Sequence, residues 1–120
     1  MRRYLNAVIA LAVLLPACDA YMNVGVAVRD RAGVAVEGAT VQLAVTADGR
    51  EVGREKTNSQ GRAEVGNVYG FRSAARRLSI QKDHYKAFST SLQPRRGYLC
   101  EVILGAEAEP EPSEGRCVGE

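Results

Sequence analysis

The feature that most constrains this chain is the alternation of apolar side chains with polar or small ones between residues 24 and 104. The first stretch is typical, because Val24, Val26 and Val28 are separated by Gly25 and Ala27. Successive side chains of a strand point to opposite faces of a sheet, so a period of two predicts half-buried β-strands. Since no stretch between them has sustained helical periodicity, the pattern predicts an all-β domain.

Turn signals divide the alternating stretches into short strands. Asp48-Gly49 is a hairpin signal, and a second turn ends at Gly61. We expect seven strands, at residues 24–29, 41–46, 51–57, 62–68, 78–80, 88–92 and 98–104. Strands of this length between turns are typical of an antiparallel β-sandwich. The residues expected in its interior are Val26, Val28, Val41, Leu43, Val45, Val65, Leu78, Ile80, Val102 and Leu104.

The first 18 residues have the three-part layout of an export signal. Arg2 and Arg3 are basic, residues 5–15 are apolar apart from Asn6, and small residues lead to Cys18. A membrane-spanning helix needs about 20 apolar residues, so this run is too short to cross a bilayer comfortably. The segment therefore predicts a function outside the cytoplasm.

The end of this segment, Leu15-Pro16-Ala17-Cys18, resembles the lipobox of bacterial lipoproteins, which usually has Ala or Ser in place of Pro16. The resemblance implies that Cys18 is lipidated and becomes the first residue after cleavage. Two or more acyl chains, such as palmitate, hold a protein stably at a membrane, whereas one does not. The expected location is the cell envelope, on the periplasmic side of the inner or outer membrane. The alternative is a secretory signal cut after Ala20, which leaves a soluble protein.

The chain therefore divides into a signal peptide at 1–17, a short tether at 18–23, a sandwich at 24–104 and a tail at 105–120. The tail holds five glutamates, one arginine and two prolines, which is typical of a flexible acidic segment. The sandwich is net basic, so contact between the two is the alternative to a solvated tail.

Two cysteines remain if Cys18 carries lipid. An oxidising compartment would permit a disulfide between Cys100 and Cys117, which would fasten the tail to the last predicted strand. The alternative is a buried thiol at Cys100 with a free or intermolecularly bonded Cys117. Spacing alone does not decide between them.

Several short motifs follow one another in a characteristic order. A strand ending in Asp30-Arg31-Ala32-Gly33 precedes a Gly-Ala-Thr-Val-Gln-Leu stretch at 38–43 and a Thr-Asn-Ser-Gln-Gly turn at 57–61. The stretch at 78–85, which ends in His84-Tyr85, and the strand at 102–104 complete the series. This order resembles transthyretin-like, carboxypeptidase-regulatory-like domains, in which Gly is usual at the position of His84. The resemblance covers residues 24–104 and implies a prealbumin-like or immunoglobulin-like sandwich.

His84 is the only histidine of the chain. A hydrolytic zinc site needs about three protein ligands, usually with two or more histidines, and a serine or cysteine nucleophile needs a histidine partner. Transthyretin-like hydroxyisourate hydrolases carry several histidines and a Tyr-Arg-Gly-Ser end, which this chain lacks. We therefore predict that the protein is not an enzyme, with no catalytic residue, metal or cofactor, and that His84 is a turn residue. The alternative is a small hydrolase of the hydroxyisourate type.

The remaining candidate for recognition is a set of basic residues in loops and strand ends of the second half, where binding sites on rigid sandwiches are common. Its members are Arg72, Arg76, Arg77, Lys82, Lys86, Arg95 and Arg96. We expect a binding or structural role toward an envelope protein or glycan, with the membrane contacted through the N-terminal lipid. The chain has no basic run or basic patch with interleaved aromatics, so we expect no nucleic acid partner. A monomer is expected.

Overall fold

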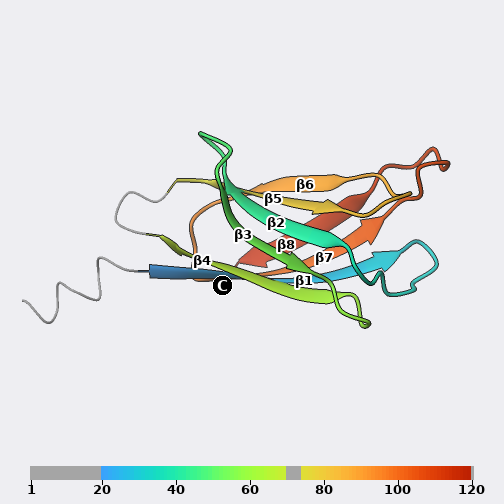
Figure 1. Cartoon of the computed structure of the whole chain (residues 1–120), viewed down its shortest axis with the longest axis horizontal. Helices are drawn as coiled ribbons and strands as arrows, with labels where there is room; N and C mark the ends of the chain where they lie inside the picture. The colour runs from blue at the N-terminus through green and yellow to red at the C-terminus, as the bar shows by residue number, and fades with distance from the viewer. Residues whose placement is uncertain (1–19, 70–73, 120) are drawn as a thin grey trace, which may run out of the picture.

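The computed structural model describes residues 20–69 and 74–119, which form eight strands. The sheets have the orders β4-β1-β7-β8 and β3-β2-β5-β6, and they face each other as a sandwich (Figure 1). The strands are β1 (Ala20–Asp30), β2 (Thr40–Val45), β3 (Glu51–Lys56), β4 (Arg62–Tyr69), β5 (Arg76–Gln81), β6 (Phe88–Leu92), β7 (Gly97–Leu104) and β8 (Glu114–Gly119). The all-β sandwich prediction is confirmed. The predicted signal peptide, Cys18 and Arg72 lie outside the described residues.

The interior forms where the apolar sides of the two sheets meet. Burial alternates along β2 and β5, as the sequence pattern predicts. All ten residues expected in the interior are buried, and they are joined there by others, including Met22, Val24 and Tyr98. Full burial of a Val or Leu side chain stabilises a fold by about 1.5–3 kcal/mol relative to exposure. This shared interior holds the loops at both ends of the sandwich in place.

The prediction of seven antiparallel strands is wrong in two respects. First, β7 lies parallel to β1, with Asn23 opposite Gly97 and Asp30 opposite Leu104. Parallel and antiparallel strands with one buried face share the same alternation, so the sequence could not distinguish them. Second, an eighth strand is present, and it belongs to the segment that was expected to be a tail.

The expectation of a flexible tail over residues 105–120 is therefore corrected. Residues 114–119 form β8, which pairs antiparallel with β7. Cys117 lies opposite Cys100, and their sulfur atoms are bonded at 2.05 Å. The structure thus contains the disulfide between Cys100 and Cys117. The glutamate content of the segment predicted flexibility, but this bond fixes β8 to β7 near the middle of the strand.

The tether expected at residues 18–23 is shorter than predicted. β1 begins at Ala20 and pairs with β4 from that residue onward. Met22 is completely buried, and the amide of Asn23 donates to the carbonyl of Arg96 at 2.9 Å. Residues 20–69 and 74–119 include no candidate for a membrane-spanning helix.

The sandwich has two ends, which we name by β1. The entry end is where β1 starts, and it carries the connections 46–50 and 93–96 (Figure 1). The far end is where β1 finishes, and it carries the β5–β6 turn and the β7–β8 connection.

Candidate functional site

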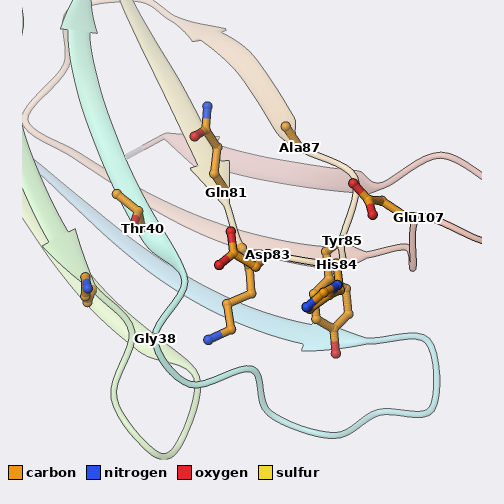
Figure 2. Close-up of a pocket in the computed structure, with 10 residues that line it drawn as sticks. Gly38, Thr40, Gln81, Asp83, His84, Tyr85, Ala87 and Glu107 are labelled. Atoms are coloured by element: carbon orange, nitrogen blue, oxygen red, sulfur yellow. The ribbon is translucent and has the colours of Figure 1, made fainter.

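An open groove with a volume of about 720 Å³ lies at the far end of the sandwich (Figure 2). Its walls come from β2, β3, the end of β5, the β5–β6 turn and the segment after β7. The residues that line it are Gly38, Thr40, Lys56, Gln81, Lys82, Asp83, His84, Tyr85, Ala87 and Glu107.

His84 occupies the β5–β6 turn with a left-handed backbone, at a φ of 72°. Among the described residues, it is the only non-glycine with a positive φ. The amide of Tyr85 donates to the carbonyl of Lys82 at 3.1 Å, which closes the turn. A side chain in this backbone region is uncommon, and such outliers cluster at functional sites. The geometry also explains why Gly is usual here in the domains that the sequence resembles.

The floor of the groove is a row of side chains across three strands. Thr40 on β2 lies opposite Lys56 of β3 and Gln81 of β5. Residues paired in this way have Cβ atoms about 5 Å apart and point to the same face. Gly38 leaves room for Lys82, whose Nζ lies 3.0 Å from the place that a Cβ of residue 38 would take. The ammonium groups of Lys56 and Lys82 therefore reach the groove from β3 and from the turn that follows β5.

The segment after β7 forms the remaining wall and holds the histidine turn. The amide of Glu107 donates to the carbonyl of His84 at 3.0 Å. The amide of Lys86 donates to the carbonyl of Gly105 at 2.8 Å, and the hydroxyl of Ser113 donates to the carbonyl of Lys86 at 2.7 Å. These bonds place the acidic segment after β7 beside the turn, so this wall of the groove depends on contacts between segments that are distant in the sequence.

The lining is polar and carries both signs of charge. Lys56 and Lys82 supply cations, Asp83 and Glu107 supply carboxylates, and His84 supplies an imidazole. An imidazole has one ring nitrogen that can accept a proton and one that can donate it, so it can act as a base or an acid. Within residues 20–69 and 74–119, no group of three or more His, Cys, Asp or Glu side chains is placed to hold a metal ion. The charged and hydrogen-bonding side chains of the lining suit a small polar molecule.

The structure does not bring the predicted basic set together. Arg77, Arg95 and Arg96 lie toward the entry end, whereas Lys82 and Lys86 lie at the far end. Arg76 is buried, with 6% of its surface exposed, and donates to the carbonyl of Ala74. The two ends of one strand lie at opposite ends of a sheet, so the six described members of the set do not form one surface.

Sequence reasoning missed most of the groove. Gly38, Lys56 and Glu107 come from segments far apart along the chain, and only the sheet pairing gathers them. One signal was available, namely a histidine at a position where the resembled domains have Gly.

No protein-family model matches the sequence, and no curated protein matches it. Among solved structures, 5-hydroxyisourate hydrolase from Klebsiella pneumoniae is similar, with a TM-score of 0.61 and 14% identity, over 81% of this chain and 99% of the hydrolase. Chlorocatechol 1,2-dioxygenase from Pseudomonas putida is similar at a TM-score of 0.54 and 15% identity, over 72% of this chain and 61% of the dioxygenase. The fold is transthyretin-like. At these identities, the comparisons establish the fold alone.

The prediction that the protein is not an enzyme is corrected by this comparison. The hydrolase has the same fold over nearly its whole length, and the similar dioxygenase is also an enzyme. That prediction was based on the number of histidines in the sequence, and it took a single histidine as too few for a catalytic site. The folded chain instead places its one histidine in a groove with two lysines and two carboxylates.

Proposed function

We propose that this protein is a small hydrolase of the transthyretin-like fold, held in the cell envelope by lipid on Cys18. The groove at the far end is its active site, and a small polar molecule is its substrate. The observation that carries the proposal is His84, which lines the groove in an unfavourable backbone conformation. The similarity to 5-hydroxyisourate hydrolase supports it at the level of the fold.

The groups of the groove suit hydrolysis of an acyl bond. A neutral His84 imidazole would take a proton from water as the water oxygen bonds to the substrate carbonyl carbon. The negative charge that develops on the carbonyl oxygen would be stabilised by the ammonium of Lys82 or Lys56. The imidazolium would then return its proton to the leaving group as the acyl bond breaks. Every proton is accounted for without a metal.

The test is turnover of a panel of cyclic amides and esters, beginning with 5-hydroxyisourate. We expect His84→Asn to lower kcat/KM by about 10²–10⁴-fold, the usual contribution of general acid–base catalysis. Asn tolerates the left-handed backbone, so a loss would not reflect a distorted turn. Lys82→Gln should also lower kcat/KM, because it removes a cation next to the developing charge. Turnover that is equal in His84→Asn and in the unchanged protein would exclude the mechanism.

Two features support the proposed location. A cut before Cys18 leaves β1 complete, because the strand begins at Ala20, whereas a cut after Ala20 removes its first residue. The bond between Cys100 and Cys117 also suits an oxidising compartment outside the cytoplasm.

Lipidation of Cys18 is tested by detergent phase separation of protein from its native cells. The unchanged protein should enter the detergent phase, and Cys18→Ala should move it to the aqueous phase, because the acyl chains are lost. An intact mass without added acyl groups would rule the lipid out. The hydrolase assay is unaffected by either result.

A further inference from the structure

The entry end of the sandwich combines exposed cations with exposed apolar side chains. Arg77, Arg95 and Arg96 are exposed there, and Arg95 lies against the end of β8, with its Cδ 3.0 Å from where a Cβ of Gly119 would be. Among the described residues, no carboxylate lies within ion-pair distance of these three arginines. Their charge is therefore available to a partner.

Two cations at the far end, Arg31 and Lys86, are engaged within the molecule. Arg31 is within 4.0 Å of three glutamates, with Nε 3.2 Å from Glu111 and 3.8 Å from Glu109. The ammonium of Lys86 donates to the carbonyls of Glu109 and Glu111. Within the described part of the chain, the three exposed arginines of the entry end have no such carboxylate or carbonyl partners next to the start of β1, where the proposed lipid lies.

Most of the large apolar side chains that are exposed also lie toward the entry end. Of the four large hydrophobic residues that are exposed in the described part, three lie toward the entry end, on the outer face of the β4-β1-β7-β8 sheet. They are Tyr21, Leu99 and Val118, with 56%, 66% and 55% of their surface exposed. Leu99 and Val118 are direct cross-strand partners. Tyrosine with a polar tip and an apolar ring is enriched at membrane–water interfaces.

We propose that this basic and apolar surface at the entry end docks onto anionic phospholipid headgroups. The inference rests on the proposed lipid at Cys18, because β1 begins only two residues later. Two residues span at most about 7 Å, so the entry end is held close to the bilayer. An exposed charge interacts over about 8–10 Å in physiological salt. The connection 93–96, which carries Arg95 and Arg96, is therefore within range of the headgroups. The far end, with its groove, then points away from the membrane.

The experiment uses the full chain purified in detergent and reconstituted into phosphatidylcholine vesicles with or without phosphatidylglycerol. The chain has no tryptophan, so Gln93→Trp places a single reporter in the β6–β7 connection. Ser59→Trp, in the turn between β3 and β4, is the matched reporter at the far end. Spin-labelled headgroups quench a tryptophan that is near the bilayer. We expect quenching of Gln93→Trp to be strong with phosphatidylglycerol and weakened by salt, and that of Ser59→Trp to be absent.

The contribution of the arginine charges to docking is tested by paired neutralising variants in the Gln93→Trp background. Each arginine beside an anionic surface contributes about fivefold to the contact equilibrium, so Arg95→Gln with Arg96→Gln should lower it about 25-fold. The control, Arg29→Gln with Arg62→Gln, removes the same charge from exposed positions toward the far end and should leave quenching unchanged.

Equal quenching in the two kinds of vesicle, or an equal loss from both variant pairs, would overturn the docking proposal. Failure of the lipid anchor is read separately. Loss of the protein from phosphatidylcholine vesicles in a high-salt wash would show that no acyl chains hold it there. The difference in quenching between vesicles with and without phosphatidylglycerol would still report on the arginines.

Discussion

At the scale of single residues, the turn that follows β3 shows why the motif at 57–61 has its composition. The buried hydroxyl of Thr57 donates to the carbonyl of Val36 at 2.6 Å and accepts from the amide of Ala39 at 2.8 Å. The carboxamide oxygen of Asn58 accepts from the amide of Arg62 at 3.0 Å. Gly61 closes the turn with a φ of 75°. Each residue type therefore meets a separate backbone requirement.

Gly61→Ala should lower the free energy of unfolding by about 3 kcal/mol. A left-handed backbone costs a residue with a Cβ about 1–2 kcal/mol, and overpacking adds a similar amount. The added Cβ would lie 2.3 Å from the carbonyl oxygen of Val28, which is backbone and cannot easily move. The control is Gly33→Ala, at a φ of 85° with no atom within 4 Å, which should cost about 1 kcal/mol. Urea unfolding of both variants gives the comparison, and equal losses would contradict the clash.

At the scale of elements, β8 completes a sheet that would otherwise end at β7. An uncovered β7 would present unpaired N–H and C=O groups to other chains. The pairing with β8 covers the edge of β7 and makes the short β8 the edge strand, and the bond between Cys100 and Cys117 fixes its register. Ion pairs from Arg31 to Glu109 and Glu111 hold the connection between the two strands. Because that connection also forms a wall of the groove, β8 contributes to the site indirectly.

Cys100→Ala combined with Cys117→Ala should lower the free energy of unfolding by about 3 kcal/mol. The bond closes a loop with a sequence separation of 17 residues, and loops of this length give about that stabilisation. Arg31→Gln is the comparison, and it should cost less than about 1 kcal/mol, because ion pairs in contact with solvent are weak. Denaturant titrations with and without reductant provide the measurement. A double variant as stable as the unchanged protein would show that β8 does not depend on the bond.

At the scale of the whole molecule, one interior joins both sheets. Residues from β1, β2, β4, β5 and β7 meet in a single buried cluster. The parallel pairing of β1 with β7 joins Asn23 to Gly97, so the sheet forms only after most of the chain is available. Topologies with such distant contacts fold slowly, but they unfold as a unit.

The molecule should therefore unfold in one calorimetric transition. For roughly 100 ordered residues, the enthalpy near 60 °C is expected to be about 70 kcal/mol, and the calorimetric and van't Hoff values should agree. Differential scanning calorimetry of the oxidised protein measures both. Two separate transitions would show that the sheets are independent.

What the sequence determined by itself is the local pattern. A period of two, ten interior positions and the Gly-containing turns all follow from side-chain and backbone preferences of neighbouring residues. They were sufficient to predict a β-sandwich, and the Asp30 and Asn58 turns are found where their motifs indicate.

Tertiary structure alone decided the direction of β7 beside β1, the strand within the acidic tail and the division of the basic residues between two ends. It also decided that His84 shares a groove with Lys56 and Glu107. These features depend on which distant strands become neighbours. That choice is set by the packing of the whole interior, which short-range patterns in a single sequence do not report.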